Sequence, residues 1–265
     1  WYAILLIALS FKELKKFGNT MIGQQQKDQA EKWFKDLRDK ICKEFEILEE
    51  DHLKLAPKSD MAAKKFERKS TIRETDDKED GGGGVMATLK GGRIFEKVGV
   101  NVSAVYGNLA PEAQKSITAR KAIPELKDDP RFWASGISLV AHMRNPHTPA
   151  IHLNTRMFWT PHAWWFGGGT DLNPSIENDD DTNFFHQTLK KKCDKHNQSY
   201  YKKFKEWADE YFFIPHRKVA RGVGGIFFDD LCTGDWEKDF SFTRDVGEAF
   251  IEAYIPIAKK HYLKD

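Results

Sequence analysis

The chain has 265 residues, enough for one large domain or two small ones with a substantial core. Its 42 basic and 40 acidic residues leave a net charge of +2, which argues against a nucleic-acid-binding protein and makes any anion recognition local. The three cysteines, Cys42, Cys193 and Cys232, form no CxxC pair, so they predict free thiols in a reducing cytoplasm rather than a disulfide framework or a zinc site.

An apolar run, WYAILLIALS, opens the chain. It has about ten residues, whereas a membrane-spanning helix needs roughly 20, and no A-x-A cleavage site follows it. We therefore expect no stable membrane insertion, and we treat residues 1–20 as an extension of uncertain origin before a domain over residues 21–265. From Gln24 to Glu50 apolar residues recur at helical spacing and predict an amphipathic scaffold helix with these residues inward: Ala30, Trp33, Phe34, Leu37, Ile41, Phe45 and Leu48.

Residues 51–84 lose this periodicity, gain charge and end in four glycines, Gly81 to Gly84. This composition predicts a mobile surface excursion. The glycines do not form a phosphate loop, because no Gly-Lys-Ser or Gly-Lys-Thr sequence follows them.

Strand patterns follow one another directly after this segment. A hairpin turn is predicted at Lys90-Gly91-Gly92-Arg93, and Val98, Val100, Val102 and Ala104 alternate as a strand. The run ISLVAHM predicts another strand, with Ser138, Val140, His142 and Arg144 on one face. Strands without intervening helices favour an antiparallel sheet and an α+β fold, because parallel neighbours need a crossover of a dozen or more residues.

The second half of the chain is predicted to be mainly helical. Residues 182–195 and 199–212 carry aromatic stripes that we interpret as core, and residues 243–262 predict a last helix. Between them, RGVGGIFFDDL predicts a short strand that begins after glycines.

The richest chemistry lies between Ser135 and Leu172, where AIHLNTRMF predicts a strand. A period of two places His152, Asn154 and Arg156 in a row on one face, opposite an apolar face. An imidazole, an amide and a guanidinium side by side suit an anionic ligand that also needs proton transfer.

The adjoining run WWFGGGTDL predicts an apolar wall followed by a glycine turn that can approach a ligand closely, with Asp171 at its end. An alternative is that Asp171 only caps the next segment.

Seven of the nine histidines lie between His142 and His216. Catalysis or metal binding is one interpretation, and the other is that each histidine satisfies a turn or a core hydrogen bond. Because there is no HExxH motif, a metal site would have to be assembled from distant residues, namely His142, His152, His186 and His216.

Seven runs of the chain resemble, in the same order, the motifs of the oxygen-dependent coproporphyrinogen III oxidases: GRIFEKVGVNVS, SGISLVAH, RNPHTPAIHLNTR, WWFGGGTDL, FHQTLKKKCDKH, YYKKFKEWADEYFFIPHR and ARGVGGIFFDDL. The resemblance extends from about Phe11 to Tyr254. It implies a single domain, a large antiparallel sheet flanked by helices on both sides, and a homodimer. It also implies oxidative decarboxylation of two propionates of coproporphyrinogen III to vinyl groups, giving protoporphyrinogen IX in haem biosynthesis.

The resemblance further implies O2 as co-substrate and no required cofactor, although bacterial members are described with four histidines as ligands of a divalent metal ion. It assigns a catalytic set of His152, Asp171 and Arg156, and a substrate-binding set of Ser138, Asn154, Thr155 and Arg156. The four metal-ligand positions fall on His142, His152, His186 and His216.

Two alternatives remain open at this stage. A metal-dependent oxygenase would use the same histidines as ligands. A catalytically impaired tetrapyrrole-binding homologue is the other, because family members continue past the last helix with an arginine-rich segment and a Tyr-Asp-Arg strand, whereas this chain stops at Asp265.

Overall fold

A computed structural model describes residues 22–56, 60–75 and 79–263. Its elements are α1 (Gln24–Leu55), β1 (Glu67–Glu74), β2 (Asp80–Lys90), β3 (Phe95–Asn108), α2 (Pro111–Lys121), the 3₁₀ helix η1 (Pro124–Lys127), β4 (Arg131–Met143), β5 (Ala150–Trp159), β6 (Trp164–Asn173), α3 (Asp179–His196), α4 (Tyr200–Tyr211), β7 (Phe213–Ile214), β8 (Val219–Ala220), β9 (Gly224–Leu231) and α5 (Trp236–His261). No helix within the described ranges is long and apolar enough to cross a membrane. The predicted N-terminal extension, residues 1–20, lies outside these ranges.

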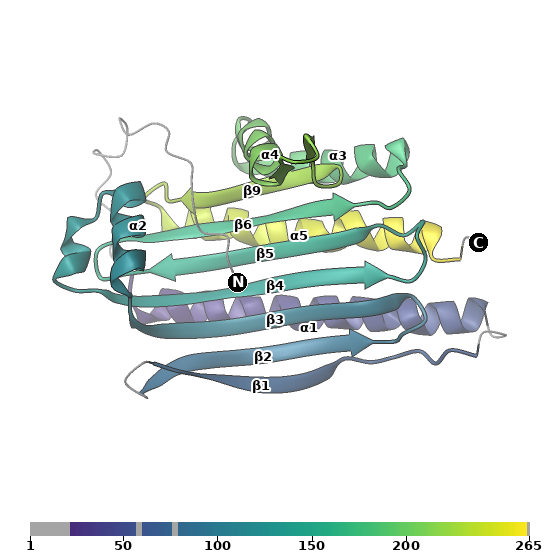
Figure 1. Ribbon diagram of the computed structural model, residues 1–265, viewed down its shortest axis with the longest axis horizontal. Helices are drawn as coiled ribbons and strands as arrows, with labels where there is room; N and C mark the ends of the chain where they lie inside the picture. The colour runs from purple at the N-terminus through teal and green to yellow at the C-terminus, as the bar shows by residue number, and fades with distance from the viewer. Residues whose placement is uncertain (1–21, 57–59, 76–78, 264–265) are drawn as a thin grey trace.

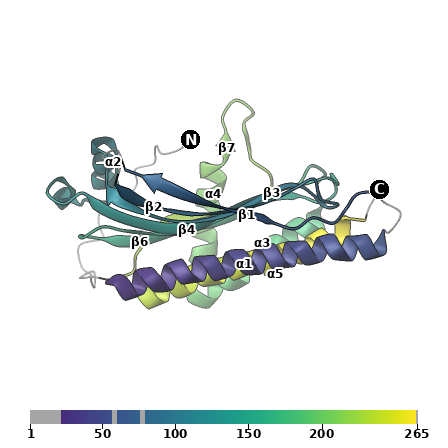
Figure 2. The same cartoon turned by 90° about the horizontal axis from the view of Figure 1, so that it is seen from below.

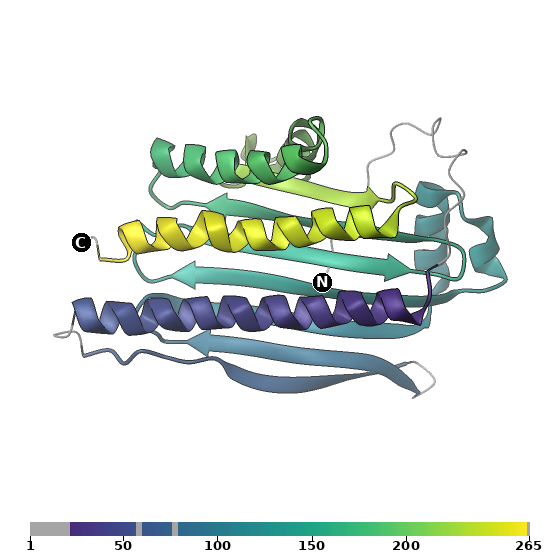
Figure 3. The ribbon, with the colours of Figure 1, turned by 180° about the vertical axis from the view of Figure 1, so that it is seen from behind.

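Seven strands form one antiparallel sheet in the order β1-β2-β3-β4-β5-β6-β9 (Figure 1). The predicted α+β class and the antiparallel sheet flanked by helices in one domain are confirmed. Helices α1, α3 and α5 all lie on one face of the sheet (Figures 2 and 3). On the other side, among the described residues, α2, one end of α4 and the β7–β8 hairpin rise above the strands (Figure 2), so the described helices leave most of this face, the open face, uncovered.

Alternation along the strands explains the layers. In β5, Ile151, Leu153 and Met157 are buried against the helices, while the residues between them point to the open face. On the other side of this core, α1 contributes a buried stripe that matches the predicted one apart from Trp33, which is only partly buried. Helix α1 packs on β3 and β4, and α5 packs on β5 and β6.

A buried carboxylate fixes α1 to the turn between β2 and β3. Glu49 is fully buried and accepts hydrogen bonds from the backbone N–H groups of Arg93, Ile94 and Phe95 at 2.7, 2.9 and 3.0 Å. A Cβ atom on Gly92 would lie 2.4 Å from Glu49 Oε1, which explains the glycine. The antiparallel pairing of β2 with β3 confirms the predicted hairpin, and the bonds to Glu49 set its position on the helix.

Two segments differ from their predictions. The excursion predicted over residues 51–84 instead includes the end of α1, the edge strand β1 and the start of β2, and Gly81 to Gly84 lie within β2. The mixed charges that conceal the pattern reflect exposure, because every residue of β1 is exposed.

The glycine turn predicted before Asp171 is also wrong, because Gly167, Gly168 and Gly169 continue the ladder of β6 opposite Arg156, Thr155 and Asn154.

In the helical half, α5 begins seven residues before the predicted position 243, at Trp236, where the Asp235 side chain caps it by accepting from Lys238 N–H. The aromatic stripes are only partly core, since Phe184 and Tyr211 are 40% and 46% exposed. Cys42 and Cys193 are buried free thiols, as predicted.

Candidate active site

The open face carries a strip of polar side chains across its central strands. The members of this open-face strip are Ser138 and His142 from β4, His152, Asn154 and Arg156 from β5, and Asp171 and Asn173 from β6. The sheet register places His152 opposite Asp171 and Asn154 opposite Ser138. The prediction that His142 and His152 share a face is confirmed, because their ring centroids lie 6.4 Å apart.

Asp171 is the most buried charge of the strip, at 1% exposure. Arg221 Nη2 lies 2.9 Å from both carboxylate oxygens, and Arg221 Nε donates to Oδ2 at 3.2 Å. Asn173 Nδ2 donates to Oδ2 at 2.6 Å, and His152 Nδ1 lies 3.4 Å from the same oxygen. Asp171 thus connects the imidazole to a guanidinium on the far side of the strip.

These contacts decide the ionisation of Asp171. Burial alone would raise the pKa of this carboxyl, but hydrogen bonding and attraction from His152, the charge of Arg221 and the Asn173 amide hold it below its ordinary value of 3.8. Asp171 is therefore an anion at neutral pH, able to accept hydrogen bonds from N–H groups.

Arg221 follows the β7–β8 hairpin, and the sequence did not predict it as a site residue. Its guanidinium carbon lies 4.2 Å from the centre of the Phe212 ring, and its side chain is 39% exposed. A signal exists in the sequence, since Arg221 immediately precedes Gly222, two residues before β9 begins at Gly224. Nothing local indicates, however, that it reaches β6.

Arg156 lies at the other end of the strip. Its Nη1 donates to Asn154 Oδ1 at 2.5 Å and its Nη2 donates to Asp229 of β9. A Cβ atom on Gly167 would lie 2.8 Å from Asp229 Oδ1, so the glycine of β6 leaves room for this pair. Asn154 also donates from Nδ2 to the Ile137 carbonyl oxygen at 3.1 Å. Both side chains are thereby held in fixed positions.

Of the other predicted substrate contacts, Ser138 is exposed on the open face, but Thr155 is not part of the strip. Thr155 is fully buried, and its hydroxyl has no hydrogen-bond partner among the described residues. The physical reason is the period of two, which sends Thr155 to the helix-covered face when Asn154 and Arg156 point to the open face. The structure therefore places the Thr155 side chain away from the strip, and its contact with substrate stays a prediction.

The four-histidine metal set does not assemble within one copy of the chain. Among the described residues no group of three or more His, Cys, Asp or Glu side chains could hold a metal ion. Both ring nitrogens of His186 are already used, because Nε2 donates to the Val223 carbonyl oxygen at 2.9 Å and Nδ1 accepts from Tyr201 at 3.0 Å. His216 lies exposed in the turn between β7 and β8. Only His142 and His152 of the set are neighbours.

Aromatic rings border the strip at two places. At the α2 end, Phe158 stacks on Trp165 with ring centroids 4.6 Å apart. On β9, Phe227 stacks on Tyr211 of α4 with ring centroids 4.2 Å apart. Flat apolar borders around cations and an anion suit a broad, flat ligand that carries carboxylates and N–H donors.

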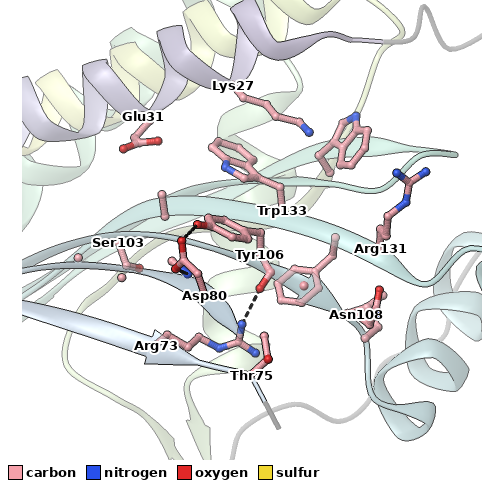
Figure 4. A pocket seen from close by; sticks show the side chains of 18 of the residues that line it. Lys27, Glu31, Arg73, Thr75, Asp80, Ser103, Tyr106, Asn108, Arg131 and Trp133 are labelled. Carbon is pink, nitrogen blue, oxygen red and sulfur yellow. Dashed lines mark hydrogen bonds between the residues drawn. The ribbon is translucent and has the colours of Figure 1, made fainter. Parts of the chain in front are cut away.

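A separate hollow of about 1360 Å³ lies between the first turns of α1 and strands β1, β2 and β3 (Figure 4). Its walls include Lys27, Trp133 and Tyr106, and Asp80 accepts a hydrogen bond from Tyr106 at 2.5 Å. None of the predicted site residues lines it. We therefore place the candidate site on the open face.

Comparison with known proteins agrees with the motifs. Residues 29–265 match the family described as coproporphyrinogen III oxidase. A relative from Rickettsia peacockii (strain Rustic), named oxygen-dependent coproporphyrinogen-III oxidase, is 46% identical over 235 residues, which are 89% of this chain and 78% of the relative. A relative of the same name from Rickettsia bellii (strain RML369-C) is 44% identical over 238 residues, which are 90% of this chain and 80% of the relative.

Proposed function

Because the chain belongs to the coproporphyrinogen III oxidase family, we propose that it converts coproporphyrinogen III to protoporphyrinogen IX in haem biosynthesis, with O2 as electron acceptor. The observation that carries this proposal beyond the family match is the buried anion Asp171 among His152, Arg221 and Asn173 on a face bordered by aromatic rings. A tetrapyrrole that is reduced presents N–H groups at its centre and carboxylates at its rim, which complements this arrangement of charges.

The chemistry to be catalysed is balanced without electrons from the protein. Each propionate carboxylate, one O2 and one proton give a vinyl group, CO2 and hydrogen peroxide. The two electrons come from the propionate side chain as it loses CO2 and a β-hydrogen, and the macrocycle ends the reaction still reduced, so no organic cofactor is needed for this route. The protein has to bind the macrocycle, exclude water and move protons.

We assign to Asp171 the contact with pyrrole N–H groups. Arg221 covers this carboxylate in the structure, but its side chain is 39% exposed and rests on the Phe212 ring at the surface. A substrate carboxylate can therefore draw Arg221 outward and leave Asp171 facing the macrocycle. Removing that cation also removes one of the causes that lower the pKa of Asp171, so the carboxylate becomes a stronger base once substrate is bound.

His152 is assigned to proton transfer. Its Nδ1 lies 3.4 Å from Asp171 Oδ2, so the carboxylate can orient the imidazole for proton transfer. Ser138 and Asn154, on the neighbouring positions of β4 and β5, are assigned to substrate contact. Arg156 is assigned to a substrate carboxylate, as a charge-assisted donor.

The metal-dependent alternative gains no support from the arrangement of the histidines, so no step is assigned to a metal ion. The non-catalytic alternative is tested directly by turnover. Purified protein, supplied with coproporphyrinogen III in air, is expected to consume two O2 and release two CO2 per macrocycle, and to stop when O2 is removed. Tight binding of the tetrapyrrole without CO2 release would refute the catalytic proposal.

A homodimer in the cytoplasm is proposed as the working form. The open face has little helical cover within the described residues (Figure 2), which a second copy could supply, and the free thiols of Cys42 and Cys193 suit a reducing compartment. Sedimentation at micromolar concentration is expected to show a dimer. A protein that sediments only as monomer while turning over substrate would refute this assembly.

A further inference from the structure

We propose that Arg120 of α2 joins Arg156 in a two-guanidinium site that binds one of the two propionates that stay on the product. This inference rests on the proposed function and identifies a substrate contact outside the predicted set. It concerns the end of the open face where α2 stands beside the central strands (Figure 1).

The two arginines share one carboxylate. Arg120 Nη1 donates to Asp229 Oδ2 at 3.0 Å, and Arg156 Nη2 donates to Asp229 Oδ1. Each guanidinium therefore uses a different oxygen, and the three side chains together carry a net charge of +1. The side chains of Arg120 and Arg156 are 36% and 34% exposed, so both keep donors available to a ligand. A carboxylate from the substrate would neutralise the remaining charge.

The position of α2 is fixed independently of Arg120. Ile117 of α2 and Leu126 of η1 belong to a small buried cluster with Trp165 of β6. The next residue, Lys121, pairs with Asp230 at 2.5 Å and lies 5.0 Å from the centre of the Trp165 ring. The helix thus stays on this end of the sheet when Arg120 is changed, so the role of Arg120 can be tested separately from folding.

The distance between His152 and the Arg120–Arg156 site indicates which of the substrate carboxylates binds at these two arginines. Arg156 lies four residues along β5 from His152, which is about 13 Å at a strand rise of roughly 3.3 Å per residue. A macrocycle centred on Asp171 spans such a distance with its propionate arms. A propionate at Arg120 and Arg156 is therefore remote from His152 while another propionate reacts, and it serves to anchor the macrocycle.

An anchoring contact is equally strong before and during the reaction, so its loss should appear in KM rather than in kcat. Arg120→Ala is expected to raise KM for coproporphyrinogen III about thirtyfold, as for the loss of one charge-assisted contact, with kcat within about threefold of the unchanged protein. Arg120→Lys should recover part of this loss, because lysine supplies the charge without the planar pair of donors. The matched control is Lys121→Ala, which removes the neighbouring ion pair between α2 and β9 and should leave KM within about twofold.

A substrate analogue separates contact from structure. Two analogues are needed, each with one of the two retained propionates replaced by an ethyl group. The KM of each analogue is measured on the unchanged protein and on Arg120→Ala. If Arg120 binds a retained propionate, the analogue that lacks this propionate should bind weakly to the unchanged protein. The Arg120→Ala substitution should then cause no further loss of affinity for it.

Fully additive losses for both analogues, or equal effects of Lys121→Ala and Arg120→Ala, would overturn the inference. An unchanged protein without any turnover would instead overturn the proposed function, so the two failures are distinguishable.

Discussion

Replacing Asp171 by asparagine removes the buried negative charge at the centre of the open-face strip while keeping the size of the side chain. The carboxylate now receives three contacts from Arg221 and one from Asn173, at 2.6 to 3.2 Å. An amide keeps one acceptor oxygen, so part of this network persists. Arg221 is 39% exposed and can be solvated by water when its partner loses charge.

Asp171→Asn should therefore lower the free energy of unfolding by about as much as the loss of one charge-assisted hydrogen bond, about 1.5 to 3 kcal/mol. For a chain of this size each kcal/mol lowers Tm by about 2 to 4 °C. Substrate affinity should change by less than about tenfold, or 1.4 kcal/mol, because the carboxylates of the substrate contact arginines and not Asp171. Turnover should fall at least about a hundredfold, as for a lost general base.

The pH dependence provides a second measurement. The pKa of Asp171 is lower in the folded protein than the ordinary 3.8, so its stabilisation is complete above pH 3.8 and is lost as pH falls through the folded value. The difference in free energy of unfolding between the unchanged protein and Asp171→Asn should therefore narrow in acid. Urea unfolding across that range measures it.

CO2 release at saturating substrate, substrate binding without O2, and thermal unfolding together test the assignment. Asp80→Asn is the matched control, because Asp80 lies in the separate hollow beside α1 and its change should leave turnover within about twofold. Near-normal turnover by Asp171→Asn would refute the assignment of Asp171 as the general base, and the Asp229-Asp230 pair would become the candidate base.

Three further predictions concern single side chains. His152→Ala should slow turnover by about tenfold, less than Asp171→Asn, if the imidazole only assists proton transfer; an equal or larger loss of kcat would make histidine the main base. Thr155→Val should raise the free energy of unfolding by up to about 1 kcal/mol, because the buried hydroxyl has no partner among the described residues, and a raised KM would return Thr155 to the substrate. Burial, with the nearby charge of Lys205, lowers the pKa of His186 below 6.5, so stability should fall as pH drops below 6.5, and urea unfolding of His186→Gln should lack this fall.

The strand assignments from sequence succeeded where alternation and burial coincide. Ile151, Leu153 and Met157 are buried while His152, Asn154 and Arg156 face outward, so a period of two was sufficient to find one side of the site. The same rule, applied to each residue of the strand, places Thr155 on the opposite face from His152, Asn154 and Arg156. The motif resemblance placed Thr155 in the substrate-binding set because a motif of consecutive residues does not show on which face of a strand each residue lies.

The rest of the site depends on contacts between distant parts of the chain. Arg221 lies 50 residues from Asp171, Asp229 lies 73 residues from Arg156, and Arg120 lies 109 residues from Asp229. No local pattern predicts such pairs, because they follow from the strand order β5-β6-β9 and from the docking of α2. The four predicted metal ligands do not come together within one copy for the same reason, since histidine spacing does not reveal that His186 already bonds to Val223 and Tyr201.

The glycines of β6 show how a correct composition led to a wrong structure. A run of three glycines usually favours a turn, but here all three pair with β5, and Gly168 and Gly169 also pair with β9. A Cβ atom on Gly169 would lie 2.3 Å from the Ile226 carbonyl oxygen, and one on Gly167 would contact Asp229. The absence of side chains at these positions keeps this part of the open face low between Asp171 and the Arg156–Asp229 pair. A flat macrocycle can therefore lie across the strip and contact both groups at once, which a turn at the same place would prevent.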